Sequence, residues 1–175
     1  MSVLAMILFP VCVNLPGILT AILLSKKIKP NYENQRQPPL SPPGWVFGPV
    51  WTILYILIGT SGYLIWSLEE GFSSKHAFAW SVYFIQLFLN YIWTPIYFGL
   101  NMMLLAFIDI VLLDIFIYLN IYAFSILYPL AGYLLIPYAI WVTFASYLNF
   151  ANWWMNRNVP EEVDGSYLEQ ISKMK

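Results

Sequence analysis

Charge is scarce in this 175-residue sequence: Asp, Glu, Lys and Arg together make up 10% of it, and the net charge is -1. This balance offers no basic surface to nucleic acid and no electrostatic anchor to a membrane surface. Cysteine and histidine are scarcer still, with one of each, Cys12 and His76. A lone cysteine excludes an internal disulfide, and one histidine with one cysteine supplies too few ligands for a histidine–thiolate metal site. We therefore expect no metal, no cofactor and no nucleic-acid partner.

Apolar residues, by contrast, make up 60% of the chain and form five long runs. Each run can supply the roughly 20 helical residues that cross a hydrocarbon core about 30 Å thick. None alternates apolar and polar residues as barrel strands would, and a helix satisfies its own backbone hydrogen bonds in lipid. The runs are residues 3–24, 45–68, 77–100, 102–126 and 130–155. The sequence thus predicts an all-α integral membrane bundle of five transmembrane helices within residues 1–156, followed by a solvated tail over residues 157–175.

Positive charges are distributed unevenly over the connections between these runs. No basic residue precedes the first run, which is too long for the core of a signal peptide and is interpreted as the first span. With five spans, one side of the membrane carries only Lys75, whereas the other holds the 25–41 loop, the 99–101 link and the tail. This second side carries Lys26, Lys27, Lys29, Arg36, Arg157, Lys173 and Lys175. Because positively charged loops stay in the cytosol, the bias predicts a cytosolic loop and a cytosolic C-terminus.

The stretch from residue 42 to residue 55 converts a proline-rich loop into the second span. Trp45 falls at headgroup depth, and Pro49 predicts a kink further in. Trp51 and Tyr55 follow at i and i+4, which places them on one face of the helix. This pair could form the wall of a site for a flat ligand, or it could belong to an aromatic belt that faces lipid.

The fifth span carries one helical stripe that contains two amides. Its members recur at i, i+3, i+4, i+7, i+8 and i+11 and are Trp141, Phe144, Ala145, Leu148, Asn149 and Asn152. Amides are costly in lipid, so the stripe should face the interior of the bundle. With Trp51 and Tyr55 on the second span, and Asn90 and Trp93 on the third, it predicts one of two structures. The first is an aromatic pocket for a small molecule; the second is a filled core joined by Asn hydrogen bonds of about 1 kcal/mol each.

Three segments together resemble the translocator protein family, whose members are also called tryptophan-rich sensory proteins or peripheral benzodiazepine receptors. The segments are PPGWVFGPVW at residues 42–51, LNYIWTPIYFG at residues 89–99 and IPYAIWVTFASYLN at residues 136–149. Their order and spacing match the family, and the resemblance covers about residues 10–156. The sequence GPVW at residues 48–51 and the Gly71-Phe72 pair resemble animal members more than bacterial ones.

The resemblance implies five helices around a cavity that binds benzodiazepine-site drugs, sterols and tetrapyrroles such as protoporphyrin IX. It places Trp51, Trp93, Trp141, Phe144, Ala145, Leu148 and Asn149 in that cavity. It also links Trp51 and Trp141 to the light-dependent porphyrin breakdown of some members. The complete set of predicted ligand-binding residues is Phe47, Trp51, Tyr55, Asn90, Trp93, Leu105, Asp109, Leu112, Trp141, Phe144, Ala145, Leu148 and Asn149.

The sequence departs from the family pattern at several of these places. Leu40 stands where the family usually has a loop tryptophan, and Leu105 stands where animal members carry a tryptophan on the fourth helix. Phe150 and Trp154 replace the tyrosine and the basic residue of a short sterol-recognition pattern, which is therefore broken here.

Two acidic residues lie within the fourth span, and they differ in their relation to the family. Asp109 matches a family position, whereas Asp114 does not. All eight Lys and Arg residues lie outside the spans, so neither acid has a cationic partner there. We expect a neutral carboxylic acid or burial against amides and tyrosines, and a single unpaired acid makes a poor proton relay.

Together these features predict a membrane receptor or translocator for porphyrins, benzodiazepine-site drugs and cholesterol. The resemblance implies the mitochondrial outer membrane, and it implies a homodimer, because family members commonly pair and Gly99 would allow helices to approach closely. One alternative is an enzyme that degrades porphyrin with light and oxygen, using Trp51 and Trp141 as electron donors. Another is a membrane scaffold that pairs with other proteins.

Overall fold

The structure is a computed structural model that describes residues 3–28, 35–68 and 71–158. Every regular element in these ranges is helical, as the apolar runs predict. The elements are α1 (Val3–Leu23), η1 (Gly44–Val46), α3 (Phe47–Leu68), η2 (Ser74–His76), α4 (Ala77–Thr94), η3 (Pro95–Gly99), α5 (Met103–Leu127), α6 (Pro129–Tyr133) and α7 (Ile136–Asn156). The all-α fold is confirmed, and the five predicted runs correspond to α1, η1 with α3, α4 with η3, α5, and α6 with α7.

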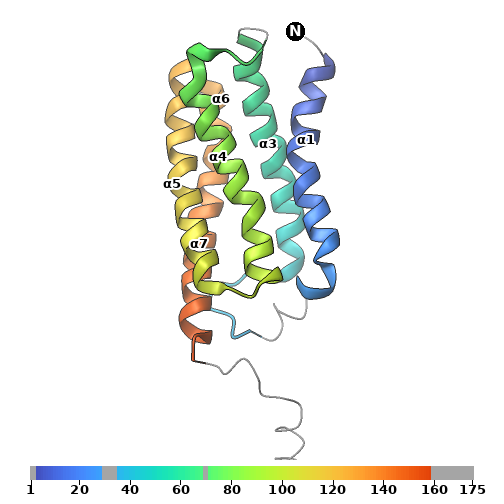
Figure 1. Cartoon of the computed structure of the whole chain (residues 1–175), viewed down its shortest axis with the longest axis vertical. Coiled ribbons are helices and arrows are strands. Elements are labelled where there is room, and N and C mark those ends of the chain that lie inside the picture. The colour runs from blue at the N-terminus through green and yellow to red at the C-terminus, as the bar shows by residue number, and fades with distance from the viewer. Residues whose placement is uncertain (1–2, 29–34, 69–70, 159–175) are drawn as a thin grey trace, which may run out of the picture.

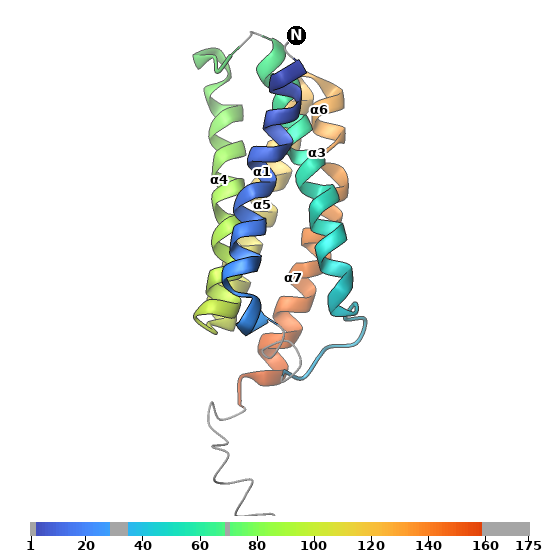
Figure 2. The same cartoon turned by 90° about the vertical axis from the view of Figure 1, so that its right-hand side faces the viewer.

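The long helices lie side by side along one axis (Figures 1 and 2). α1 packs against α3, while α4 packs against α5 and α5 packs against α7. α3 and α7 make few backbone contacts with each other, although both border the interior. Side chains of α3 and α4 that contact α7 therefore hold these helices together.

The connections between helices gather at two opposite ends of the bundle. The start of α1, η2 and α6 lie at one end. The opposite end, which we call the loop end, holds residues 35–43, the link between η3 and α5, and the end of α7 (Figure 1). The predicted grouping of these connections is confirmed for the described residues. Residues 29–34 of the loop, and all of the predicted tail except residues 157 and 158, lie outside the described residues.

Length and composition allow four stretches to cross a membrane: Val3–Leu23, Gly44–Leu68, Met103–Leu127 and Pro129–Asn156. α4 with η3 lies parallel to them and carries its amides Gln86 and Asn90 on a buried face. Large apolar side chains cover much of the outer surface of the helices, an arrangement that is stable in lipid and costly in water. The chain is therefore an integral membrane protein.

Prolines explain where the helices differ from the predicted runs. Pro137 has no N–H and would clash with the preceding turn, so the fifth run divides into α6 and α7. Pro95 begins the wide turn of η3, in which the Leu100 nitrogen donates to the Pro95 carbonyl at 2.9 Å. Pro49 lies in the first turn of α3, where its missing donor breaks no helical bond. The kink predicted at Pro49 is therefore wrong.

Candidate functional site

An aromatic cluster joins α3 to α7 on the side of the bundle nearer the loop end. Trp51 lies 5.5 Å from Tyr55 along α3 and 6.2 Å from Tyr138 on α7, measured between ring centroids. Phe47 lies 5.8 Å from Trp141, which in turn lies 6.0 Å from Phe144. We call these six residues, Phe47, Trp51, Tyr55, Tyr138, Trp141 and Phe144, the aromatic cluster. Its rings are held by edge and tilted contacts, the geometry that aromatic pairs prefer.

A chain of hydrogen bonds connects the two tyrosines of this cluster to α4 and so links α3, α4 and α7. The Tyr55 hydroxyl donates to Asn90 Oδ1 at 2.7 Å, and Asn90 Nδ2 donates to the Tyr138 hydroxyl at 2.9 Å. The Tyr138 hydroxyl donates to Gln86 Oε1 at 3.1 Å. The chain fixes the two tyrosine rings of the aromatic cluster against α4. In this part of the bundle the interior is a filled core joined by Asn hydrogen bonds, which is the second of the two structures that the sequence predicts.

A second set of polar contacts lies closer to the loop end. Trp93 Nε1 donates to Asn149 Oδ1 at 3.2 Å, and the Trp93 ring stacks on Tyr97 at 5.1 Å. Asn152 Nδ2 donates to the Tyr97 hydroxyl at 2.9 Å. Asn90, Asn149 and Asn152 are all buried, so the prediction that these amides face the interior is confirmed.

Residues 35–43 form a strap that lies across the loop end. The Tyr97 hydroxyl donates to Gln35 Oε1 at 2.6 Å. Arg36 and Asn156 exchange two hydrogen bonds, from Arg36 N to Asn156 Oδ1 at 3.0 Å and from Asn156 Nδ2 to the Arg36 carbonyl at 3.1 Å. Leu40, which stands at the family tryptophan position, is 78% exposed. The strap thus closes this end of the bundle without adding a ring to the aromatic cluster.

The predicted ligand-binding residues fall into three groups in the structure. Those brought together around the aromatic cluster and its hydrogen bonds are Phe47, Trp51, Tyr55, Asn90, Trp93, Trp141, Phe144 and Asn149. Ala145, Leu148 and Asp109 are buried within the bundle. Leu105 and Leu112 are 41% and 44% exposed on α5, so the structure does not bring them into the interior.

Sequence reasoning missed Tyr138 and Gln86, although both carried a usable signal. Tyr138 lies three residues before Trp141 and therefore extends the α7 stripe by one turn. Gln86 lies four residues before Asn90 on the same face of α4. Extending each stripe by one turn would have included both residues.

The aromatic cluster offers apolar area and one unused donor. Trp51, Trp93, Trp141 and Phe144 are only partly buried, although three of them pack against the core. The indole N–H of Trp141 is buried and has no acceptor among the described residues. A buried donor without a partner costs about 1–3 kcal/mol, which an acceptor on a ligand would recover.

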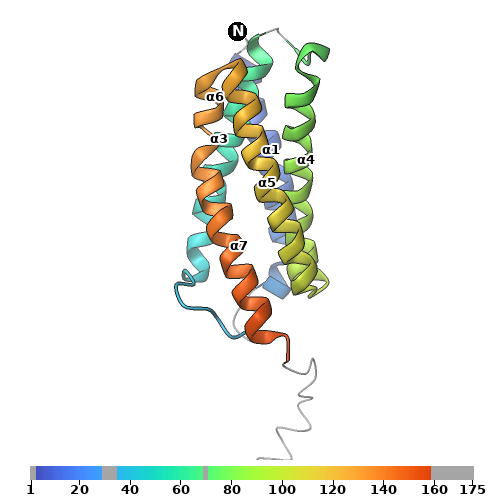
Figure 3. The same ribbon diagram turned by 90° about the vertical axis from the view of Figure 1, so that its left-hand side faces the viewer.

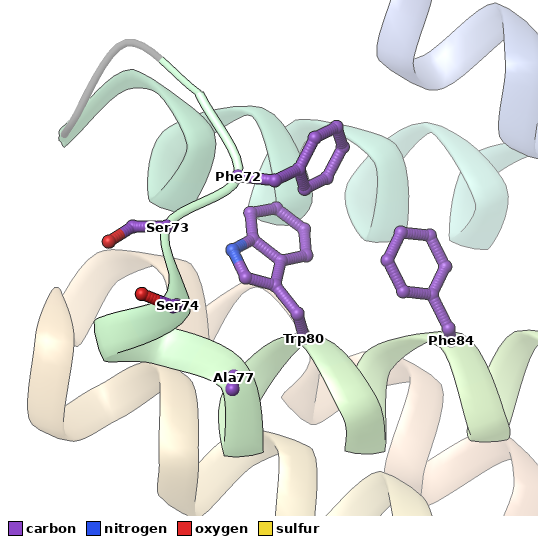
Figure 4. A pocket seen from close by; sticks show the side chains of 6 residues that line it. All are labelled: Phe72, Ser73, Ser74, Ala77, Trp80 and Phe84. Atoms are coloured by element: carbon purple, nitrogen blue, oxygen red, sulfur yellow. The ribbon is translucent and has the colours of Figure 1, made fainter.

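A hollow that the sequence did not predict lies at the opposite end of the bundle (Figure 4). It is open to the surroundings, has a volume of about 430 Å³, and is lined by Phe72, Ser73, Ser74, Ala77, Trp80 and Phe84. The Phe72 and Trp80 rings lie 4.6 Å apart, and Trp80 stacks on Phe84 at 5.9 Å. This hollow is a competing location for an aromatic ligand.

Asp114 lies on the outside of the bundle, where Thr143 of α7 donates to its two carboxylate oxygens at 3.1 and 3.0 Å. Replacing Asp114 by Asn is expected to change the free energy of unfolding by less than about 0.5 kcal/mol. The amide keeps the shape of the side chain and an acceptor for Thr143, and Asp114 is not a member of the aromatic cluster. Unfolding in detergent and porphyrin titrations would measure both effects, and a clear loss of porphyrin affinity would contradict this placement.

Comparison with known proteins places this arrangement in a family. Residues 6–155 match the TspO/MBR family. The Tryptophan-rich protein TspO of Archaeoglobus fulgidus is 35% identical over 156 residues, covering 89% of this chain and 99% of the relative. The Translocator protein of Homo sapiens is 38% identical over 122 residues, covering 70% of this chain and 72% of the relative. The Tryptophan-rich sensory protein of Cereibacter sphaeroides is 38% identical over 136 residues, covering 77% and 83%.

The human and the Cereibacter sphaeroides relatives are both 38% identical to this chain, so identity does not single out the animal members. The match spans every helix from α1 to α7 and contains the three tryptophan-bearing segments from which the resemblance was inferred. The chain therefore belongs to the TspO/MBR family.

Proposed function

We propose that the protein is a membrane receptor or translocator that binds a planar hydrophobic ligand, with porphyrins such as protoporphyrin IX as the leading class. The observation that carries the proposal is the aromatic cluster between α3 and α7, together with Trp93 on α4. Five of the six rings in the cluster, all except that of Tyr138, are partly buried and provide flat apolar surfaces. Small-molecule sites are usually apolar with a few placed polar groups.

Ligand entry requires α3 and α7 to separate near the loop end. These helices meet largely through side chains, such as the Phe47–Trp141 and Trp51–Tyr138 pairs, rather than through close backbone packing. A flat ring system could replace these contacts with stacking of similar energy. The Trp141 N–H would then donate to an acceptor at the edge of the ligand.

Charge favours a carboxylate-bearing ligand in this position. Lys27 donates to the Gly99 carbonyl, Arg36 exchanges hydrogen bonds with Asn156, and Arg157 directly follows α7, so three cations lie at the loop end, toward which the acidic groups of a porphyrin would point. Benzodiazepine-site drugs and cholesterol are proposed as further ligands of the same cluster. For cholesterol the support is weaker, because Phe150 and Trp154 replace the sterol-recognition residues and are both exposed.

We also propose the mitochondrial outer membrane as the location, a homodimer as the assembly, and a cytosolic loop end. In the structure Gly99 faces Leu24 of the same chain, whose side chain lies 3.8 Å from the position of a Cβ added at Gly99. A dimer would therefore need contacts beyond Gly99.

The orientation can be tested by protease digestion of intact membranes whose outer face is cytosolic. A C-terminal tag is expected to be removed, while a tag placed in the connection between α3 and α4 is expected to survive. The reason is the bias of seven basic residues against one between the two sides. Protection of the C-terminal tag would contradict the proposed orientation.

The porphyrin proposal itself is tested by titrating the purified protein with protoporphyrin IX. Saturable binding that weakens when rings of the aromatic cluster are removed would support it. The magnitudes expected for Trp51 and Trp141 are argued in the Discussion.

A further inference from the structure

Three polar side chains lie together on the outer face formed by α5 and α7. Thr143 donates to both carboxylate oxygens of Asp114, and the Tyr118 hydroxyl lies 3.0 Å from Thr143 Oγ1. Tyr118 and Thr143 are exposed, and Asp114 is partly exposed. Because the Thr143 proton is given to Asp114, the Tyr118 hydroxyl must be the donor in its contact with Thr143. We call these three residues the α5–α7 acid site.

The hydrogen bonds of the acid site all point toward the carboxylate. One hydroxyl proton is shared between two oxygens, so most of the acceptor capacity of Asp114 remains unused. Hydrogen bonds that run toward an acceptor in series strengthen one another, and a carboxylate at membrane depth is costly unless a cation pairs with it. The site is therefore prepared to accept a further donor, and a charged donor above all.

The acid site lies near the middle of the membrane-spanning part of the protein. Asp114 follows Met103 by eleven residues, which corresponds to about 17 Å along α5. The neighbouring positions along the two helices carry exposed apolar residues, Val111 and Ile115 on α5 and Ile140 one turn before Thr143 on α7. Figure 3 shows α5 and α7 side by side on this face, with no other helix of the chain in front of them. Headgroups do not reach this depth, so the missing donor must come from within the bilayer.

A second copy of the chain cannot supply a cation at this depth. All eight Lys and Arg residues lie outside the membrane-spanning helices. Charged residues inside membranes are expensive and pair with one another. We propose that the α5–α7 face docks a transmembrane helix of a different membrane protein, one that is apolar apart from a single Lys or Arg near its midpoint.

The test measures association in phosphatidylcholine vesicles by energy transfer between the labelled full-length protein and a synthetic helix. The helix is a leucine-rich transmembrane peptide with one central lysine, and the control peptide carries leucine at that position. The lysine peptide is expected to bind the wild-type protein about tenfold more tightly than the leucine peptide does, a preference of about 1.4 kcal/mol.

Variants of the acid site should remove this preference and leave the rest of the protein unchanged. Asp114→Asn is expected to abolish the advantage of the lysine peptide without changing the binding of the leucine peptide. Tyr118→Phe and Thr143→Val, which keep the carboxylate, are expected to reduce the advantage partly. Tyr122→Phe is the matched control, because Tyr122 is exposed on the same helix one turn further along.

Three results would overturn the proposal. One is equal binding of the two peptides to the wild-type protein, and another is an advantage of the lysine peptide that survives Asp114→Asn. The third is energy transfer between two differently labelled copies of the chain that falls in Asp114→Asn, without any preference between peptides. That third result would mean that a second copy occupies the face.

Discussion

Replacing both Trp51 and Trp141 by alanine is expected to weaken the binding of protoporphyrin IX at least tenfold, by about 1.4 kcal/mol or more. Each indole presents a ring that is only partly buried and in contact with a second ring, Tyr138 or Phe47. Removing one indole from a dry aromatic contact costs on the order of 1–3 kcal/mol, or roughly five- to two-hundred-fold in affinity. The absorbance of the porphyrin, followed during titration, measures the effect without depending on the tryptophan signal.

Trp45→Ala is the matched control for this experiment. Trp45 is 77% exposed at the start of η1, close in sequence to the aromatic cluster but outside it. Its removal is expected to leave porphyrin affinity within about twofold of the wild-type value. Unchanged binding in a folded Trp51→Ala, Trp141→Ala double variant would contradict binding at the aromatic cluster, for a receptor and for an enzyme alike, and would leave the hollow or the scaffold hypothesis.

Phenylalanine at the same two positions separates a receptor from an enzyme. Phenylalanine keeps an aromatic face, so a receptor should retain most of its affinity and form no product in light. A degrading enzyme would keep its binding but lose the light-dependent product, because phenylalanine is much harder to oxidise than tryptophan. The exposed position of Leu40 leaves the aromatic cluster without the family's loop indole, which favours binding over degradation.

Replacing Gly59 by alanine is expected to destabilise the protein by about 1–3 kcal/mol. A Cβ at this position would lie 2.6 Å from the Pro10 backbone nitrogen and 2.9 Å from the Phe9 carbonyl carbon, so α1 would have to move away from α3. In the interior of an unpacked helix the same substitution stabilises by about 1 kcal/mol. The expected effect therefore has the opposite sign to the intrinsic helix preference.

Gly48→Ala provides the control on the same helix, because no atom beyond its chain neighbours and its own helix backbone lies within 4 Å of a Cβ added there. It is expected to leave the free energy of unfolding unchanged or slightly raised. Unfolding in mixed detergent micelles, followed by circular dichroism, compares the two variants directly. A Gly59→Ala variant as stable as the wild-type protein would mean that α1 and α3 are not in close backbone contact.

The all-α fold and the interior position of the amides could be predicted because both follow from local rules. A run of about 20 apolar residues must be helical in lipid, and amides avoid lipid wherever they can. The interior-facing stripe of α7 could also be predicted, because Trp141, Ala145 and Asn149 recur at the spacing of one helical face. The family resemblance rested on the same segments and added the ligand class.

The fourth span shows where this reasoning failed. Nearly every residue of α5 is apolar, so the sequence does not reveal which stripe faces inward. The structure buries Ala106, Asp109, Ile110 and Leu113, which centres the stripe between Asp109 and Ile110. Leu105 and Leu112 fall at its edge and face outward. The close approach of Gly59 to Pro10 could not be predicted from the sequence either, because it depends on which helices pack against each other.

The most direct test of the central proposal is the fluorine NMR spectrum of protein labelled with fluorotryptophan, recorded while protoporphyrin IX is added. The chain has eight tryptophans, and single Trp→Phe variants assign their signals. Ring currents of a porphyrin bound at the aromatic cluster should shift Trp51, Trp93 and Trp141, while Trp45, Trp66 and Trp80 stay in place. Shifts confined to Trp80 would instead place the ligand in the hollow at the opposite end of the bundle and would contradict the proposed site.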